Sequence, residues 1–332
     1  MIDRRLSVAP MMDWTDRFDR YFLRLISKRT VLYSEMITTG ALLFGDAERH
    51  LAFDQAEHPV ACQLGGSEPG DLARAARLVA QAGYDEVNLN VGCPSDRVQS
   101  GRFGACLMAE PALVRDCIAA MRSAVDIPVT VKCRIGIDGR EDYDDLARFV
   151  ETVRESGCDT FVVHARIAIL AGLSPKENRE IPPLRYEDVF RLKSGFPDIS
   201  ISLNGGVRTV DEASEILNRL DGVMIGRAAY QDPFCLAEAD RQIFGDSSAR
   251  RITRHDVVRE ILPYVDRQVR GGVALHHITR HMLGLFNGVP GARRWRRYLS
   301  ENAYRAQAGT EVLEQALSLV PEDTVVIAPS AS

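Results

Sequence analysis

A cysteine between two backbone breakers stands at the end of an alternating apolar stretch. Residues 86–91 read Glu-Val-Asn-Leu-Asn-Val and are followed by Gly92, Cys93 and Pro94. The alternation predicts a short buried strand that stops where the glycine and the proline begin a loop. A lone cysteine is commonly a small buried apolar residue, but enzymes often place chemistry in loops at strand ends. Cys93 is therefore the first candidate catalytic residue.

Six other cysteines compete with Cys93 for a chemical role. Five of them lie in or near stretches with strand or helix periodicity and are interpreted as packing residues: Cys62, Cys117, Cys133, Cys158 and Cys235. Cys106 follows Gly101-Arg102-Phe103-Gly104 and is the main rival. No two of the seven cysteines form a CxxC pair, so the sequence predicts no disulfide framework and no metal site.

A lysine interrupts the apolar stretch Val129–Ile135. A lysine buried in a strand needs a partner for its charge, so Lys132 is a second candidate for chemistry. Its ammonium could lie against the electron-rich N1 and O2 edge of a flavin and stabilise the reduced anion. It could equally form a Schiff base, as in the barrel aldolases. The residue type alone leaves both alternatives open.

Two glycine-containing turns follow later apolar stretches, Asn204-Gly205-Gly206 and Gly226-Arg227. Such turns expose backbone N–H groups to an anion, and an arginine adds a charge-assisted hydrogen bond. After the seventh and eighth strands of a barrel, the two turns together predict a phosphate site for a substrate or a cofactor. His164 and Arg166 end an earlier strand, and we expect them to contact a ligand at the same mouth.

Apolar runs alternate with helical patterns over roughly the first 230 residues, which is typical of an α/β protein. The predicted strands are residues 7–11, 31–36, 60–64, 86–91, 129–135, 160–164, 200–203 and 222–225. Eight strands separated by helices predict a (β/α)8 TIM barrel, in which the strand ends named above meet at one mouth. A doubly wound sheet is the alternative, but no GxGxxG motif follows the first strand.

The pattern changes after the barrel. Residues 257–269, 275–286, 291–306 and 311–320 all have helical spacing and predict a small C-terminal all-α helical domain. Residues 244–250 read as a linker. We therefore predict a catalytic barrel domain over residues 1–243 and a helical domain over residues 244–332.

The formal net charge of −5 is unevenly distributed along the chain. Residues 250–305 contain twelve arginines, no lysine and four acidic residues, so this segment is net +8 and the remainder is net −13. A solvated helix surface explains single arginines. The cluster Arg293-Arg294-Trp295-Arg296-Arg297 is more typical of a phosphate-binding face, because arginine makes forked phosphate contacts and stacks on bases.

The composition is that of a globular protein with a large core: 332 residues, 45% of them hydrophobic and 26% charged. No apolar stretch is long enough to span a membrane, and the N-terminus has no signal-peptide pattern. A cytoplasmic location is the default expectation.

Several motifs occur in the same order in the tRNA-dihydrouridine synthases, and the chain resembles that family over essentially its whole length. The motifs are Ala9-Pro10-Met11-Met12-Asp13-Trp14-Thr15-Asp16, Asn88-Leu89-Asn90-Val91-Gly92-Cys93-Pro94-Ser95, Lys132-Cys133-Arg134-Ile135-Gly136, His164-Ala165-Arg166, Asn204-Gly205-Gly206 and Gly226-Arg227. Residues 172–179 look like the A subfamily, which acts on D-loop uridines 20 and 20a. The chain departs from that subfamily at Ile167-Ala168-Ile169, where Lys-Ala-Trp is often found.

The resemblance implies an FMN-binding barrel and a helical domain that helps to hold tRNA. By matching motif, the FMN contacts are Pro10, Met11, Met12, Gln63, Lys132, His164, Asn204, Gly205, Gly206, Gly226 and Arg227. Asn90 and Arg166 are expected to contact the uracil base of the tRNA. Other parts of the tRNA are expected to contact Lys176, Arg179, Arg293, Arg294, Arg296 and Arg297. NADPH would reduce FMN, the flavin N5 would deliver a hydride to uracil C6, and Cys93 would protonate C5. No metal and no obligate protein partner are expected.

Two other functions compete with a flavin-dependent tRNA reductase. A flavin barrel that acts on a free pyrimidine, as dihydroorotate dehydrogenases do, would resemble the first domain but would lack a basic helical appendage. A non-catalytic RNA-binding protein would not need the full set of polar strand ends. The sequence therefore favours the tRNA reductase, with the uracil flipped out of its stack to reach the flavin.

Overall fold

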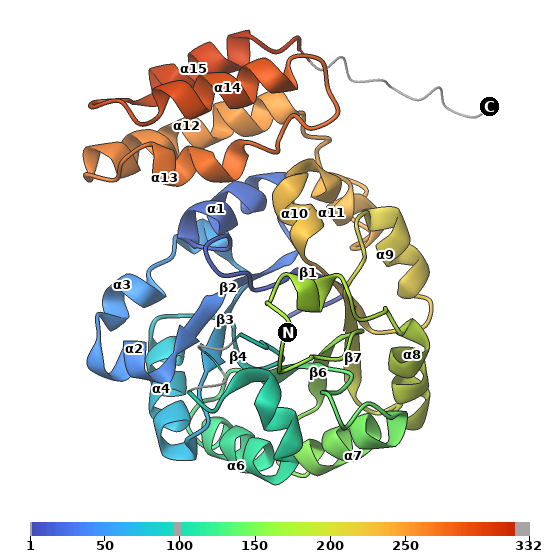
Figure 1. Cartoon of the computed structure of the whole chain (residues 1–332). Coiled ribbons are helices and arrows are strands. Elements are labelled where there is room, and N and C mark those ends of the chain that lie inside the picture. Colours follow the sequence, from blue (N-terminus) through green and yellow to red (C-terminus); the bar gives the residue numbers. More distant parts are fainter. Residues whose placement is uncertain (1, 96–97, 99–100, 323–332) are drawn as a thin grey trace, which may run out of the picture.

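The computed structural model describes residues 2–95, 98 and 101–322. In this part of the chain, eight parallel strands pair in sequence order, and the last pairs with the first to close a barrel (Figure 1). The strands are β1 (Leu6–Val8), β2 (Val31–Thr38), β3 (Val60–Gly65), β4 (Glu86–Val91), β5 (Val129–Arg134), β6 (Thr160–His164), β7 (Ser200–Asn204) and β8 (Gly222–Ile225). The predicted (β/α)8 barrel is confirmed.

Successive side chains of a strand point alternately to the apolar core between the sheet and the helices and to the interior of the barrel. On β4, Val87, Leu89 and Val91 are fully buried in the large apolar core that the barrel helices also enter. The intervening Asn88 and Asn90 pair in register with residues of β3 and β5 and are also buried. Because successive side chains of a strand point to opposite faces, these amides lie inside the barrel.

Helices follow the strands and surround the barrel (Figure 1). They are α1 (Arg17–Ile26), α2 (Thr39–Phe44), α3 (Ala47–Leu51), α4 (Pro69–Gln81), α6 (Pro111–Arg122), α7 (Tyr143–Arg154), α8 (Tyr186–Gly195), α9 (Val210–Ile216), α10 (Arg227–Gln231) and α11 (Ala239–Gln242). Short 3-10 turns join them: η1 (Gln55–Glu57), η2 (Gly104–Ala109), η3 (Glu177–Arg179) and η4 (Pro233–Leu236). Proline opens α4 and α6, where its missing N–H costs no helical hydrogen bond.

A second layer of helices lies on one side of the barrel, next to α1 and α10 (Figure 1). It consists of α12 (Arg254–Arg270), α13 (His276–Thr279), η5 (Arg280–Met282), α14 (Ala292–Asn302) and α15 (Thr310–Ser318). The fully buried Trp295 of α14 donates from Nε1 to the carbonyl of Met282 at 3.0 Å. None of the helices in the described residues is long and apolar enough to cross a membrane.

Several predicted elements are shorter in the structure, among them the first strand and the helix 275–286. The first strand ends at Val8 rather than at residue 11, because Pro10 has no N–H to donate to a ladder. The predicted helix 275–286 was wrong, since it breaks after four residues into η5 and turns. Here the backbone passes so close to α10 that a Cβ on Gly284 would lie 2.3 Å from the carbonyl oxygen of Gln231.

Candidate active site at the mouth of the barrel

Cys93 lies in a turn that the side chain of Asn90 closes. Oδ1 of Asn90 accepts hydrogen bonds from the backbone N–H of Gly92 at 3.1 Å and of Cys93 at 3.0 Å. On the other side, the N–H of Ala105 donates to the carbonyl of Cys93 at 2.9 Å. The thiol is half-buried, and its Sγ is 3.5 Å from Oγ of Ser95. The sulfur is therefore held at the strand end and remains accessible.

The other cysteines have surroundings that differ from those of Cys93. The thiol of Cys106, within η2, donates to the carbonyl of Phe103 at 3.1 Å, and burial raises its pKa. Cys62, Cys117, Cys133 and Cys158 are buried, as expected of packing residues, and burial raises the pKa of each to about 12. Burial raises the pKa of the half-buried Cys235 to about 12 as well.

Lys132 points into the barrel from β5 and reaches across to β7. Its Nζ donates to Oδ1 of Asn204 at 3.0 Å, and Nδ2 of Asn204 donates to the carbonyl of Met224 on β8 at 2.8 Å. Among the described residues, no acidic side chain forms an ion pair with Lys132. Burial and the nearby Arg134 lower the pKa of the lysine to about 8. The ammonium is thus a half-buried cation with a neutral partner.

Further cations gather around Lys132 at the same mouth. Burial, and then the charges of Arg134, Lys132 and Arg166, hold the pKa of His164 well below its ordinary value. Arg227 forms an ion pair with Glu180, with Nη1 and Oε1 2.8 Å apart. Positive charge at the mouth therefore exceeds the negative charge that the described residues supply, which is the condition for binding an anion.

A glycine turn follows β7 beside these cations. Gly205 and Gly206 have φ angles of +112° and +81°, which side chains rarely adopt. A Cβ on Gly205 would lie 2.7 Å from Cδ2 of His164, and one on Gly206 would lie 2.6 Å from the hydroxyl of Tyr186. The turn therefore requires glycine at both positions. With the surplus cations beside it, and with Gly226 and Arg227 following β8, it fits the phosphate of a mononucleotide such as FMN.

The remaining predicted cofactor residues lie on β3 and in the loop after β1, the strand next to β8 in the barrel. Pro10, Met11 and Met12 form the loop after β1, in which the N–H of Met11 donates to Oγ1 of Thr15 at 3.0 Å. Gln63 on β3 is buried, and its amide bonds to side chains of β4. The structure thus places the predicted cofactor residues on β1, β3, β5, β6, β7 and β8 around one barrel end.

The predicted tRNA contacts fall into two groups. Lys176 and Arg179 are exposed beside η3, near Arg166, whose Nη1 donates to the carbonyl of Pro182. The four arginines of α14 lie on the helical layer, away from this loop: Arg293, Arg294, Arg296 and Arg297. Two of the four have side-chain partners, because Arg296 donates to Oδ1 of Asn287 at 2.8 Å and Arg297 pairs with Glu301 at 2.7 Å.

Arg134 belongs to one of the motifs at the strand ends, but no role was predicted for it. Its buried guanidinium donates to the carbonyl of Gly92 at 3.2 Å, beside Cys93. It also donates to the carbonyls of Ile167 at 3.0 Å and Asn178 at 2.9 Å. The arginine therefore ties the cysteine turn to the loop that carries Lys176 and Arg179. Its position at the end of β5 was the only available signal.

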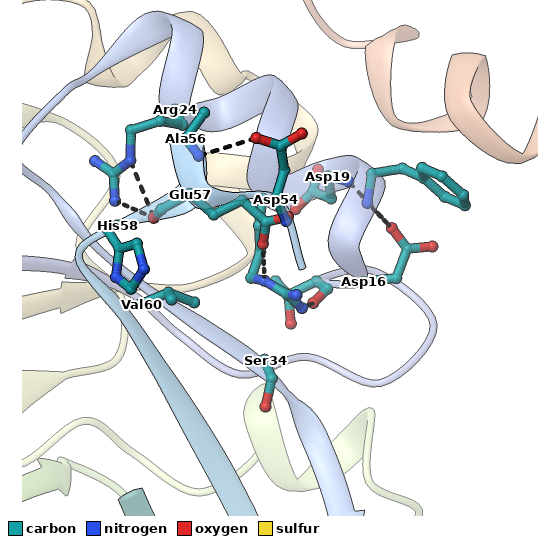
Figure 2. Close-up of polar contacts among 12 residues, drawn as sticks. Asp16, Asp19, Arg24, Ser34, Asp54, Ala56, Glu57, His58 and Val60 are labelled. Carbon is teal, nitrogen blue, oxygen red and sulfur yellow. Dashed lines mark hydrogen bonds and ion pairs between the residues drawn. The ribbon is translucent and has the colours of Figure 1, made fainter. Parts of the chain in front are cut away.

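A polar contact between the barrel and the C-terminal helices was also not predicted from the sequence. Asp16 caps α1, and its Oδ1 accepts from the N–H of Phe18 at 2.9 Å and of Asp19 at 3.1 Å (Figure 2). Its Oδ2 accepts from Nη2 of Arg280 at 2.7 Å and lies 3.1 Å from Nε2 of His281. Burial alone would raise the pKa of Asp16, but His281 and Arg280 lower it to about 2. The loop after β1 is thereby attached to η5.

Asp19 lies on the same helix as a buried acid (Figure 2). Neither of its carboxylate oxygens has a hydrogen-bond partner among the described residues, and Oδ1 is 3.8 Å from Nδ1 of His281. Burial and then the charge of Asp16 hold the pKa of Asp19 well above its ordinary value.

Further along α1, Arg24 donates to the carbonyl of Glu57 at 3.2 Å, so both ends of the helix are fixed by polar contacts (Figure 2).

Comparison with known proteins identifies the family. The model of the family described as "Dihydrouridine synthase (Dus)" matches residues 7–320. A protein of Vibrio vulnificus (strain CMCP6) named tRNA-dihydrouridine(20/20a) synthase is 60% identical over 320 residues, which cover 96% of this chain and 98% of that protein. A protein of the same name from Pseudomonas putida (strain KT2440) is 59% identical over 317 residues, covering 96% of this chain and 94% of that protein.

A solved structure shares the fold at low sequence identity. A 2-naphthoyl-CoA reductase in complex with 2-naphthoyl-CoA superposes with a TM-score of 0.55 and 11% identity, covering 73% of this chain and 50% of the other. This likeness supports the barrel alone. The family match over nearly the whole chain carries the assignment: the protein belongs to the dihydrouridine synthase family.

Proposed function

We propose that this protein is a flavin-dependent tRNA-dihydrouridine synthase that reduces the D-loop uridines at positions 20 and 20a. Relatives that match it end to end at about 60% identity bear that name. The observation that carries the proposal is the mouth of the barrel, where a half-buried cysteine, surplus cations and the Gly205-Gly206 turn lie at the same ends of the strands. A flavin-dependent reductase of a nucleic acid needs a general acid, a site for an anionic cofactor and space for a flipped nucleobase, all at the same place.

The cofactor proposed for the mouth is FMN, with NADPH as the reductant. Bound FMN supplies a hydride for C6 of the uracil. The phosphate is held by Gly205, Gly206, Gly226 and Arg227. Lys132 stabilises negative charge that develops on the cofactor, because the lysine is a half-buried cation without an acidic partner among the described residues. His164 closes the site between Lys132 and the glycine turns.

The proton is supplied by the protein. Cys93 donates it from Sγ to C5 of the uracil, which completes the saturation of the C5–C6 bond. Its turn is fixed by Asn90 from within the barrel and by Arg134 from the side, so the sulfur is held in a defined position. Asn90 and Arg166 contact the flipped base, and no metal ion takes part in this scheme.

The tRNA is held by two basic surfaces. Lys176 and Arg179 lie at the mouth, and the arginines of α14 lie on the helical layer, so one tRNA that meets both spans the two predicted domains, residues 1–243 and 244–332. Phosphate contacts of this kind set position and register rather than read sequence. No protein partner is required for this arrangement, and the reaction places the enzyme in the cytoplasm with its tRNA substrate.

Mapping dihydrouridine in tRNA tests the function directly. In a strain that lacks this chain and has no other 20/20a activity, expression of the chain should restore dihydrouridine at positions 20 and 20a, and expression of Cys93→Ala should not. Unmodified uridine at both positions in the strain with the wild-type chain would refute the proposal.

The cofactor is tested on the purified protein. We expect a yellow protein with a flavin absorption spectrum, from which heat releases FMN as identified by mass. Anaerobic NADPH should bleach that spectrum. A colourless protein that neither binds added FMN nor oxidises NADPH would contradict the assignment.

A further inference from the structure

We propose that a line of buried side chains inside the barrel, here called the polar spine, positions Cys93 for proton transfer. The polar spine consists of Glu86, Thr130, Asn88, Gln63 and Asn90. Its lower members, Glu86, Thr130 and Asn88, act as positioning residues through the amides above them. The inference rests on the proposed function, in which Cys93 is the acid.

Every link of the polar spine has the length of an ordinary hydrogen bond. Thr130 donates to Oε1 of Glu86 at 2.6 Å, and Nδ2 of Asn88 donates to the hydroxyl of Thr130 at 2.8 Å. Nε2 of Gln63 donates to Oδ1 of Asn88 at 2.8 Å, and Nδ2 of Asn90 donates to Oε1 of Gln63 at 2.7 Å. The last link is the N–H of Cys93, which donates to Oδ1 of Asn90. From Glu86 upward, the bonds cross from β4 to β5, return to β4, cross to β3 and return to β4.

The spine is inaccessible to solvent at its base. Glu86, Asn88 and Thr130 have exposed fractions of 0%, 0% and 1%. Glu86 is also bound by Nε of Arg4 at 2.6 Å and by the hydroxyl of Tyr33 at 2.6 Å. A buried carboxylate with such partners is a fixed acceptor, because losing a partner would leave a charge without compensation.

Glu86 dictates the direction of every bond above it. An ionised carboxylate can only accept, so the Thr130 hydroxyl must donate its one proton to Glu86. Toward Asn88 the hydroxyl oxygen can then only accept, and it accepts from Nδ2–H of Asn88. That places Oδ1 of Asn88 toward Gln63, and the same reasoning places Oε1 of Gln63 toward Asn90. Oδ1 of Asn90 is therefore left to face the N–H groups of Gly92 and Cys93. The amide orientations follow from one acid at the base of the barrel.

Removing one hydrogen bond of the polar spine would allow the amides above it to reorient. Without the Thr130 hydroxyl, the amide of Asn88 loses its acceptor and can turn over, and Gln63 and Asn90 can follow. Asn90 would then present its NH2 group to two backbone N–H donors. Donors cannot bond to donors, so the turn that carries Cys93 would shift away from the position that proton transfer requires.

The test compares three variants of the flavin-loaded enzyme. Thr130→Val removes the hydroxyl with little change of shape, and Thr130→Ser restores it. The matched control is Thr160→Val on the adjacent β6, where the buried hydroxyl donates to Oδ1 of Asp159 at 2.8 Å and belongs to no such line. One measurement is the rate at which iodoacetamide alkylates Cys93, followed by peptide mass mapping, with Cys106 as the reference in the same sample. The other is kcat and KM for tRNA, expressed per bound flavin.

We expect Thr130→Val to change the alkylation rate of Cys93 about fivefold, while Cys106 is unaffected. We also expect kcat for uridine reduction to fall about 10- to 100-fold with little change in KM. Thr130→Ser and Thr160→Val should behave like the wild type. If Thr130→Val does not fold, Thr130→Ala removes the same hydroxyl.

Two results would count against the polar spine: equal Cys93 alkylation rates in Thr130→Val and Thr160→Val, or equal losses of kcat in both. The alkylation measurement needs no tRNA. If the wild-type protein reduced no uridine, the proposed function would fail, and the alkylation rates would still decide whether the spine holds Cys93.

Discussion

Lys132 and Asn204 meet inside the barrel, with Nζ 3.0 Å from Oδ1, although 72 residues separate them in the sequence. Asn204 directly precedes the Gly205-Gly206 turn, so the hydrogen bond joins the half-buried cation to the proposed phosphate site. A lysine with a neutral partner keeps its charge available for a ligand, whereas a salt bridge would neutralise it.

Lys132→Ala should slow the reduction of the bound flavin by NADPH about tenfold or more, because negative charge on the reduced cofactor loses its neighbouring cation. Stopped-flow bleaching of the flavin spectrum measures this rate. Lys193→Ala is the control, since Lys193 pairs with Asp221 at 2.8 Å and lies in α8, outside the mouth. Equal reduction rates and flavin contents in the two variants would remove Lys132 from the mechanism.

Cys93→Ala should leave flavin reduction by NADPH nearly intact and should slow uridine reduction by about two to four orders of magnitude, the usual contribution of a positioned acid. Single turnover of pre-reduced enzyme with tRNA isolates this step. Cys106→Ala is the matched control and should react like the wild type, because its thiol is engaged with the carbonyl of Phe103. A stalled Cys106 variant beside an active Cys93 variant would reverse the assignment.

The arginines of α14 should differ in their contribution to tRNA binding. Arg293 and Arg294 are exposed and have no side-chain partner among the described residues, so each is free to meet a phosphate. Arg293→Gln and Arg294→Gln should each reduce the slope of log affinity against log salt by about 0.7 to 0.9. Filter binding at several salt concentrations measures the slope.

Arg270→Gln serves as the control for the salt slopes. Arg270 ends α12 and pairs with Asp266 at 3.1 Å, so its loss should leave the slope unchanged. If Arg293→Gln and Arg294→Gln gave the same slope as Arg270→Gln, the arginines of α14 would be only a solvated helix face.

Asp19→Asn should stabilise the protein at high pH. The pKa of Asp19 is raised in the folded state, so the protonated acid contributes stability at low pH that is lost as the pH rises through the folded-state pKa. Asparagine cannot ionise and avoids this loss. Other groups near Asp19 are Asp16, Arg20, Glu35, Tyr230, Arg280 and His281.

Thermal unfolding between pH 5 and pH 8.5 measures the effect. The melting temperature of Asp19→Asn relative to the wild type should increase toward the alkaline end by roughly 1 to 3 °C. Asp144→Asn is the control, because the side chain of Asp144 is 82% exposed. A difference that is constant over this pH range would show that Asp19 does not titrate there.

The barrel could be predicted from the sequence because its signals are local. Alternating apolar residues mark a strand such as Glu86–Val91 wherever it pairs, and glycine and proline mark its end. The glycine turns and Cys93 were found for the same reason. The helix 275–286 was mispredicted. It ends at Thr279, and the chain that follows packs at Gly284 against Gln231, a contact that no local pattern records.

The partners of the buried polar groups could not be predicted. The sequence shows that Asn88 and Asn90 need hydrogen bonds, but the partners Gln63 and Thr130 lie on neighbouring strands, and their identity depends on strand register. The joint between Asp16 and Arg280 joins residues 264 positions apart. Such contacts arise from tertiary packing and leave no periodic signal.

The fixed direction of the polar spine limits how this sequence can change over evolution. Replacing Thr130 alone leaves the amide of Asn88 without its acceptor, and replacing Gln63 alone leaves the amides of Asn88 and Asn90 each without a partner. A single substitution therefore destabilises the protein. Replacing neighbouring members together by apolar residues of the same shape removes both halves of a bond and costs far less. The residues of the spine should therefore be inherited as a set, and a relative that lacks one of them should also have exchanged the next.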